Sequence, residues 1–268
     1  MSCCNEFSKG TYIKRFRLIN LAVRISMPIN IIFIILVIIF TTTSFAKQPF
    51  KVVVGLSKPP YVIEKEQSGF ELELVRQILT TMGKSTEFVF VPFGRSEKMF
   101  ELADINAVIT VNNQIFPNIA SLSDIYITYQ NIAISMKKNA ISLNKISDLS
   151  QYSIASFQLA HKVLGEEFAL AATSSSMFIQ VANQEKQVEL LLLGRVDVLV
   201  MDVKIFLHYL NKLNRSEQQS EIQFHHIFPL SPYRVAFKNN QDANAFNQAL
   251  SKFKASNDYQ KLVEKYNF

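Results

Sequence analysis

Short runs of β-branched residues alternate with segments of helical spacing along most of this chain, and no other feature restricts its fold as strongly. Residues 51–56 (KVVVGL), 87–91 (EFVFV) and 196–201 (VDVLVM) are typical of buried strands. Between the first two runs, apolar residues of helical spacing predict a helix over 69–83. Strands that alternate with helices pair largely in parallel and are covered on both faces. The sequence therefore predicts an α/β protein.

The remaining expected elements continue this alternation. We expect further strands at 105–111, 128–136, 152–157, 222–228 and 233–237, and further helices at 96–103, from 158 to about 170, and at 183–193, 203–213, 242–254 and 257–266. No internal repeat and no linker rich in Pro, Gly or Ser interrupts the pattern. A chain of 268 residues has room for one large domain or two lobes.

The first 46 residues have the features of an export signal. Residues 31–40 (IIFIILVIIF) form an unbroken apolar run, which has the length of a signal-peptide core and about half the length that a helix needs to span a bilayer. Basic residues precede the run, and the small side chains of Ser44 and Ala46 follow it. We therefore expect cleavage after Ala46, with Met27 as a possible true start. An uncleaved N-terminal anchor is the alternative.

The predicted mature chain, residues 47–268, is free of cysteine, since Cys3 and Cys4 both precede the apolar run. It therefore has no disulfide, thiol nucleophile or thiolate metal site, and it suits an oxidising compartment. Of the 28 basic and 22 acidic residues, five and one lie in the first 46. The rest of the chain keeps 23 basic and 21 acidic residues, a balance too even for a nucleic-acid-binding surface.

Eight segments of the predicted mature chain carry a family resemblance. They are residues 54–61 (VGLSKPPY), 69–74 (GFELEL), 90–93 (FVPF), 105–109 (INAVI), 123–126 (SDIY), 146–149 (ISDL), 194–202 (GRVDVLVMD) and the final helix at 255–268. In this order they resemble family 3 of the solute-binding proteins, the periplasmic receptors of ABC importers for polar amino acids and similar small solutes. Each segment alone is a weak signal, but eight in the family's order are fairly specific.

The resemblance implies a two-lobe periplasmic-binding-protein fold (type II), with two mixed, mostly parallel sheets and a ligand cleft between the lobes. Lobe 1 is expected at 47–136 plus 230–268, and lobe 2 at 137–229. It also implies a monomeric periplasmic receptor that captures a small polar or amino-acid-like solute by hinge closure, with the permease of an ABC importer as its partner. We expect no catalytic residue, no cofactor, no metal and no nucleic-acid partner.

Seven residues are candidates for the ligand site. They are Tyr61, Phe93, Arg95, Asn112, Tyr126, Gln158 and Asp202. The resemblance implies that Phe93 is an aromatic wall and that Asp202 accepts a ligand ammonium. Arg95 follows a strand and can present a fork of donors to a carboxylate.

Five of the candidates also have a purely structural alternative. Tyr61 can cap the lobe surface, and Tyr126 can be a core aromatic. Arg95 can be a solvated arginine or form a salt bridge with Glu97 or Asp104, while Asn112 suits a turn. Asp202 can cap the helix expected at 203–213, a role that can coexist with ligand contact.

Two departures from the family pattern concern the carboxylate of an amino-acid ligand. The family's carboxylate-binding arginine is replaced by Phe116, and its Gly-Thr after the strand that opens lobe 2 is replaced by Leu159-Ala160. Either Arg95 or Arg234 takes over this role, or the ligand is not a standard α-amino acid; Gln158 and His161 are further possible donors. An aromatic-rich cleft, formed by Tyr61, Phe93, Phe116, Tyr126 and Phe157, would suit a larger or more apolar solute.

Two rival functions follow from the same fold. One is a periplasmic enzyme similar to cyclohexadienyl dehydratase, which would need a cleft acid with a shifted pKa that the sequence does not identify. The other is an orphan sensory receptor for a membrane signalling partner. The pair His225-His226 does not predict a metal site, because neighbouring residues on a strand point to opposite faces.

Overall fold

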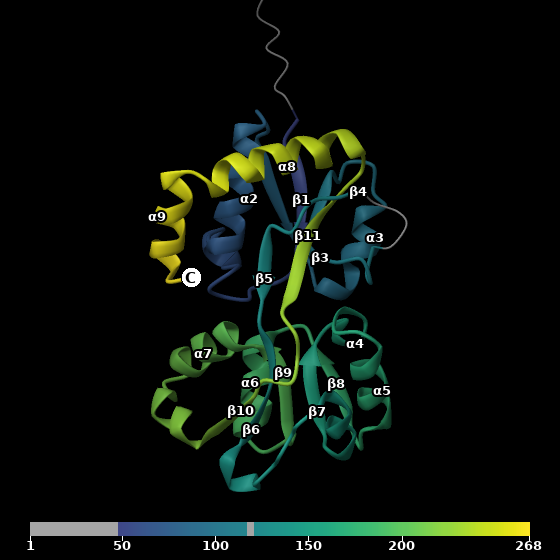
Figure 1. Ribbon diagram of the computed structural model, residues 1–268, viewed down its shortest axis with the longest axis vertical. Helices are drawn as coiled ribbons and strands as arrows, with labels where there is room; N and C mark the ends of the chain where they lie inside the picture. The colour runs from purple at the N-terminus through teal and green to yellow at the C-terminus, as the bar shows by residue number, and fades with distance from the viewer. Residues whose placement is uncertain (1–47, 117–120) are drawn as a thin grey trace, which may run out of the picture. The chain divides into compact units, whose positions relative to one another are not determined.

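The computed structural model describes residues 48–116 and 121–268. The predicted signal segment, with its cleavage site after Ala46, lies outside these residues. Within them the chain forms two α/β lobes, each built on its own sheet (Figure 1). The α/β class and the two-lobe architecture expected from the sequence are confirmed.

The first lobe contains a six-stranded sheet with the order β2–β1–β3–β11–β4, in which β5 also pairs with β11. Its strands are β1 (Phe50–Val54), β2 (Thr86–Phe90), β3 (Ala107–Val111), β4 (Ser121–Leu122), β5 (Ile127–Tyr129) and β11 (Ser231–Phe237). β2 and β3 pair with β1 in parallel, whereas β11 is antiparallel to its three neighbours. The carboxyl ends of β1, β2 and β3 consequently meet at one edge of the sheet.

The second lobe contains a five-stranded sheet with the order β10–β6–β9–β7–β8. Its strands are β6 (Asn131–Met136), β7 (Ile154–Phe157), β8 (Phe178–Val181), β9 (Val198–Asp202) and β10 (Ile222–His225). β7 pairs in parallel with β8 and β9, and β6 is antiparallel to β9 and β10. Both sheets are therefore mixed.

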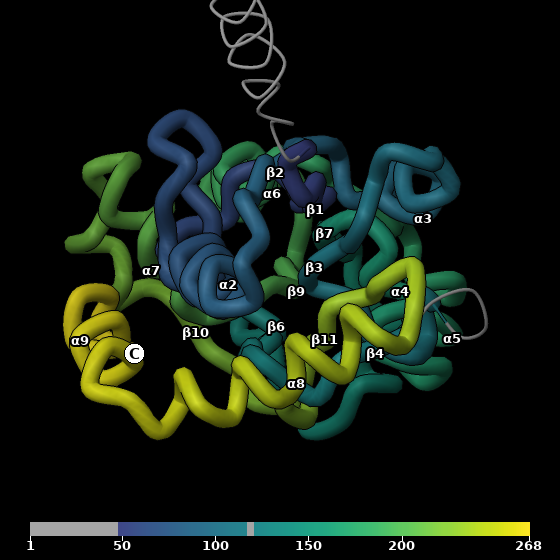
Figure 2. The backbone as a smooth tube through the Cα atoms, turned by 90° about the horizontal axis from the view of Figure 1, so that it is seen from above, coloured from purple at the N-terminus to yellow at the C-terminus, as the bar shows by residue number. Residues whose placement is uncertain are grey.

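Helices pack against both sheets. They are α2 (Phe70–Thr81), α3 (Ser96–Phe100), α8 (Asn240–Lys254) and α9 (Asn257–Tyr266) in the first lobe, and α4 (Ala160–Val163), α5 (Glu166–Ser174), α6 (Gln184–Leu192) and α7 (Val203–Lys212) in the second. Short 3₁₀ turns lie at η1 (Glu64–Glu66), η2 (Phe93–Arg95), η3 (Lys137–Asn139), η4 (Ile146–Gln151) and η5 (Ser216–Glu221). α2, α8 and α9 pack together (Figure 2), whereas α3 contacts β1 and β3. None of the helices within the described residues is long and apolar enough to cross a membrane.

The chain first changes sheets at Gln130, earlier than expected. We predicted one strand over 128–136 in the first lobe, but Tyr129 pairs with Ser231 in the first sheet and Asn131 pairs with Asp202 in the second. The expected lobe boundary at residue 136 therefore has to be corrected to about residue 130. Apolar strands buried on both faces carry no pattern that tells which sheet they join, which is why the sequence did not mark this change.

The segment after β7 also differs from the prediction. One helix to about residue 170 was expected, but Gly165, with φ +92, separates α4 from α5. Strand β8 was not predicted at all. Its four residues place two side chains on each face, too few to show a period-2 pattern.

Each lobe encloses its own aromatic cluster. In the first lobe, Phe246 has no exposed surface and contacts Phe237 and Tyr126. In the second, Phe168 contacts Phe178 and Phe228. Aromatic side chains bury large apolar areas, so these clusters hold the helices to the sheets.

Gly69 begins α2 at a position where no side chain fits. Its φ is +115, and a Cβ on it would lie 2.4 Å from the carbonyl oxygen of Tyr61. Its N–H donates to the Tyr266 hydroxyl at 2.9 Å, and that hydroxyl donates to Glu73 Oε1 at 2.6 Å. The start of α2 is thereby tied to the C-terminal helix α9.

We expect Gly69→Ala to destabilise the protein by about 3 kcal/mol or more, because the added Cβ would overlap backbone atoms at a strained φ. Gly83→Ala is the matched control: φ there is +69, but a Cβ would meet no atom within 4 Å. It should cost only about 1 kcal/mol. Urea unfolding of both variants measures the difference, and equal losses would contradict the steric argument.

Candidate functional site

Strand ends from both lobes meet around one cavity. In the first lobe, Gly55 follows β1 and Thr110 lies near the end of β3; in the second, Gln158 follows β7 and Asp202 ends β9. Open α/β sheets bind ligands beyond the carboxyl ends of their strands. This cavity is therefore the candidate ligand site.

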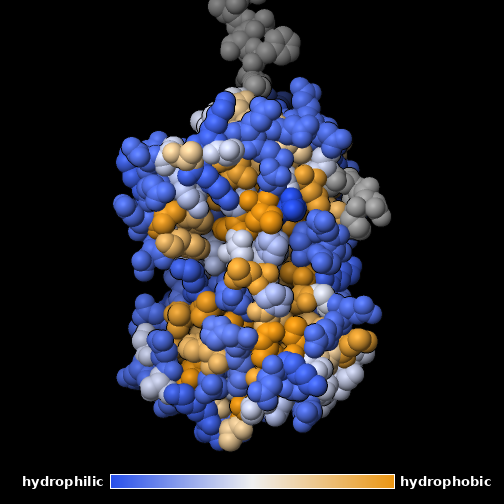
Figure 3. Space-filling view, viewed as in Figure 1, coloured by the Kyte–Doolittle hydropathy of each residue, from blue (hydrophilic) through white to orange (hydrophobic). Residues whose placement is uncertain are grey.

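Aromatic, aliphatic and amide side chains form most of the cavity lining. The lining residues are Gly55, Leu56, Lys58, Phe93, Thr110, Tyr129, Asn131, Phe157, Gln158, Val181, Ala182, Gln184, Asp202, Ile205 and Tyr233. The volume is about 50 Å³, room for a few water molecules, whereas small-molecule pockets usually measure ~300–1,000 Å³. A solute of amino-acid size therefore does not fit the cavity as it stands, and the lobes or the lining side chains must move to admit it. On the face drawn in Figure 3, apolar residues gather over the middle and hydrophilic residues surround them.

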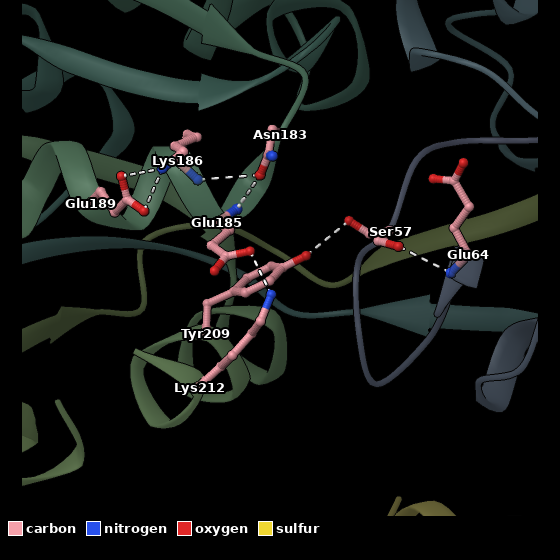
Figure 4. Close-up of polar contacts among 8 residues, drawn as sticks. All are labelled: Ser57, Glu64, Asn183, Glu185, Lys186, Glu189, Tyr209 and Lys212. Atoms are coloured by element: carbon pink, nitrogen blue, oxygen red, sulfur yellow. Dashed lines mark hydrogen bonds and ion pairs between the residues drawn. The ribbon is translucent and has the colours of Figure 1, made fainter. Parts of the chain in front are cut away.

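Hydrogen bonds hold the two lobes together around the cavity. The Tyr209 hydroxyl of α7 donates to the Ser57 carbonyl at 3.1 Å, and Ser57 Oγ accepts from the N–H of Glu64 (Figure 4). The Gly94 N–H donates to Gln158 Oε1 at 3.2 Å. A neutral hydrogen bond contributes only ~0.5–1.5 kcal/mol, so contacts of this strength hold the lobes together yet can be broken.

A buried ion pair lies beside the cavity in the first lobe. Lys58 is 7% exposed and Glu71 has no exposed surface, and Lys58 Nζ lies 3.2 Å from Glu71 Oε2. Glu71 also accepts from the hydroxyls of Tyr126, Tyr129 (2.6 Å) and Thr110 (2.5 Å). Burial lowers the pKa of Lys58, and the Glu71 carboxylate opposes that shift. The carboxylate thus has four donors, which use its acceptor capacity.

Thr110 links this ion pair to the cavity wall. Its Oγ1 accepts from Lys58 Nζ at 2.7 Å, and its N–H donates to the Tyr126 hydroxyl at 2.9 Å. Its φ is +61, which is rare for a β-branched residue and costs ~1–3 kcal/mol. The surrounding hydrogen bonds hold this strained conformation, and strain of this kind is frequent at ligand sites.

Asp202 lines the cavity but is fully engaged by the protein. Its Oδ1 accepts from the N–H groups of Lys204 (2.9 Å) and Ile205 (3.2 Å), which caps α7. Its Oδ2 accepts from the Gln130 N–H at 2.8 Å and the Tyr61 hydroxyl at 3.2 Å. Burial raises the pKa of Asp202, and these hydrogen bonds oppose the shift. The capping role expected from the sequence is present.

Three of the seven predicted site residues line this cavity: Phe93, Gln158 and Asp202. Tyr61 and Tyr126 lie inside the first lobe, each 2% exposed. Tyr61 stacks on Tyr129 with 3.8 Å between ring centroids, and Tyr126 donates to Glu71. Tyr126 is thus a core aromatic, its structural alternative, whereas Tyr61 is buried instead of capping the lobe surface, and its hydroxyl donates to Asp202.

The other two predicted residues lie away from this cavity. Arg95 is exposed at the end of η2 and is not among the lining residues. Asn112 Nδ2 donates to the Val163 carbonyl at 3.3 Å and lines a separate cavity that also includes Arg234. Arg234 donates to the Ser123 carbonyl at 2.5 Å. In this arrangement neither Arg95 nor Arg234 reaches the cavity as a replacement for the family's arginine.

The two positions that depart from the family pattern are used for packing. Phe116 is fully buried and meets Phe100 edge-on, so it does not contribute to the cleft. Leu159 has φ +62, and its N–H donates to Gln180 Oε1 at 2.6 Å. His161 packs edge-on against the ring of Phe178 and is not among the residues that line the cavity.

Sequence reasoning missed the residues of the ion-pair network and several lining residues. They are Lys58, Glu71, Thr110, Tyr129, Asn131, Gln184 and Tyr233. A signal for Glu71 was present: it precedes Val75 by four residues and Leu79 by eight, and both are buried. A charged residue on the buried stripe of a helix requires a partner. Among the described residues, no cluster of three or more side chains is suited to hold a metal ion.

We expect Lys58→Met and Glu71→Gln, made singly, to destabilise the protein by about 3–5 kcal/mol, because each breaks a buried ion pair from one side. The double variant removes both charges, so it should lose clearly less than the sum of the two single losses. Urea unfolding of the three variants tests this coupling. Additive losses would show that the two side chains do not depend on one another.

Comparisons with known proteins place this geometry in context. The profile of "Bacterial extracellular solute-binding proteins, family 3" matches residues 50–268. A comparison with curated protein sequences found no match.

Three similar solved structures each share the fold at low sequence identity. An ancestral arginine-binding protein bound to arginine is 20% identical, with TM-score 0.68 and coverage of 82% of this chain and 98% of that one. A histidine kinase sensor domain with similarity to periplasmic binding proteins is 13% identical, with TM-score 0.70 and coverage of 82% and 96%. The ancestral amino acid-binding protein AncCDT-1, a precursor of cyclohexadienyl dehydratase, is 19% identical, with TM-score 0.66 and coverage of 82% and 95%.

At these identities the similar structures support the fold alone, whereas the family profile covers nearly the whole described chain. The chain belongs to the bacterial extracellular solute-binding proteins, family 3.

Proposed function

We propose that this protein is an exported receptor that captures a small polar or amino-acid-like solute between its lobes and delivers it to the permease of an ABC importer. The observation that carries the proposal is the cavity at the carboxyl ends of strands from both sheets. A ligand that contacts both lobes stabilises their closed arrangement relative to an open one. The closed arrangement is then the form of the protein that the permease recognises.

Two further observations support this proposal. Hydrogen bonds of modest strength join the lobes, such as that from Tyr209 to Ser57, and bonds of this strength can be broken when the lobes open. The apolar run at 31–40 followed by Ser44 and Ala46 agrees with export by a cleaved signal peptide. Amino-acid binding by proteins of similar fold supports the proposed class of solute.

The function is tested by producing the full-length chain in a bacterial host and recovering it from the periplasmic fraction, where we expect a new N-terminus at Lys47. The purified protein is then heated with amino acids, polyamines, opines, peptides and aromatic acids. A solute at 100 times its Kd adds ~2.7 kcal/mol, which raises Tm by roughly 5–10 °C.

Two results would contradict the proposal. One is a full screen without any stabilising solute while a known binding protein responds in the same plates. The other is turnover of arogenate or prephenate, which would identify an enzyme on this fold instead.

We expect Tyr209→Phe to weaken binding of the solute found in this screen by about two- to tenfold, because the closed arrangement loses one hydrogen bond between the lobes. Tyr152→Phe is the matched control, since no hydrogen bond of the Tyr152 hydroxyl occurs in the part of the chain that the structure describes. Titration calorimetry measures both affinities. Equal affinities for the two variants would exclude Tyr209 from control of closure.

A further inference from the structure

The cavity holds an ammonium group with unused donor capacity. Among the described residues that line the cavity, Lys58 is the only cation. Its Nζ has three N–H donors. One is directed to Thr110 Oγ1 at 2.7 Å and another to Glu71 Oε2 at 3.2 Å. The third has no oxygen or nitrogen acceptor within residues 48–116 and 121–268, where Nζ otherwise only faces the Tyr129 ring, 5.1 Å from its centroid. A buried donor of this kind favours an acceptor oxygen from a ligand.

The two buried carboxylates near the cavity have no acceptor capacity left. Asp202 receives two donors on each oxygen, and Glu71 likewise receives two on each. A carboxylate offers about four lone-pair sites. The ammonium of an α-amino acid would therefore lose its hydration in this cavity without gaining a carboxylate partner, which is costly.

The rest of the lining is suited to an apolar body with a neutral polar group. The rings of Phe93, Tyr129, Phe157 and Tyr233 all contribute to the wall. Gln184 also lines the cavity, and its Oε1 is buried without a hydrogen-bond partner in the described chain. An unpartnered side-chain amide can bond to a ligand hydroxyl or amide, whichever way the amide is turned.

We propose that Lys58 binds the anionic group of the ligand and that the ligand is a carboxylic acid with an apolar or aromatic body and no requirement for an α-ammonium group. This inference rests on the proposed solute-binding function and names the class of solute for that same cavity. Lys58 supplies the donor in place of the arginine that the family pattern has at Phe116. Gln184 adds a preference for a hydroxyl or amide on the ligand.

The inference is tested with five compounds that share a phenyl ring on a short chain: 3-phenylpropanoate, 2-hydroxy-3-phenylpropanoate, phenylalanine, phenethylamine and 3-phenylpropan-1-ol. Calorimetry at pH 7.5 with the exported protein gives each Kd. We expect the two acids without an ammonium to bind at least tenfold more tightly than the other three compounds. Binding of phenylalanine as tight as that of 3-phenylpropanoate would overturn the proposal.

The same series separates this inference from the proposed function. If a solute from the broad screen binds and none of the five does, the acid class named here is wrong while the receptor function stands. If no solute binds in either set, the receptor function itself fails.

Variants locate the anion-binding group. The double variant Lys58→Met with Glu71→Gln should lose at least tenfold in affinity for 3-phenylpropanoate, whereas exposed Lys65→Met should leave it unchanged. Gln184→Leu, which keeps the ion pair intact, should remove any advantage of the 2-hydroxy acid over 3-phenylpropanoate. A folded double variant, verified by circular dichroism, that binds the acid as wild type does would exclude Lys58. If that variant does not fold, the compound series on the wild-type protein decides.

Discussion

A carboxylate with no exposed surface must be neutralised inside the protein, and Glu71 imposes this condition on the first lobe. Its donors come from segments far apart in the chain: the loop after β1, the end of β3, the segment before β5, and β5 itself. Three of these donors, Lys58, Thr110 and Tyr129, also line the cavity. Part of the cavity wall therefore depends on satisfying one buried charge.

The need to neutralise the Glu71 carboxylate also determines which polar groups the cleft presents to a ligand. Lys58 is held at the wall by Glu71 and Thr110, so its ammonium is fixed in direction while one donor remains for a ligand. Thr110 keeps an unusual backbone conformation because three hydrogen bonds hold it there. Asp202 is engaged in a comparable way in the second lobe, where it caps α7 and accepts from Tyr61 across the lobes. Each lobe thus presents to the cavity polar groups that already have hydrogen-bond or ion-pair partners within the protein.

Much of the fold could be predicted from the chain because its elements are strongly patterned. The apolar stripe of α2 and the β-branched runs of β1 and β9 were located to within a few residues. Strand β8 and the change of sheet at Gln130 were missed, since short or fully buried strands lack the alternation that reveals them. Of the predicted site residues, Phe93, Gln158 and Asp202 line the cavity because each follows or ends a strand at the shared edge. Tyr126 instead donates to Glu71 inside the first lobe, and Tyr61 donates to Asp202 without lining the cavity itself.

By itself, the sequence determined the α/β class, the family resemblance and the strand ends around which a site forms, because these depend on local periodicity and on segment order. The tertiary structure alone decided which side chains face the cavity and which of their hydrogen-bonding groups remain unused. That outcome depends on contacts between residues separated by tens of positions, such as Lys58 with Glu71 and Thr110 or Tyr61 with Asp202. No local pattern encodes such pairings, because burial and the competition among donors for one carboxylate arise only when distant segments meet.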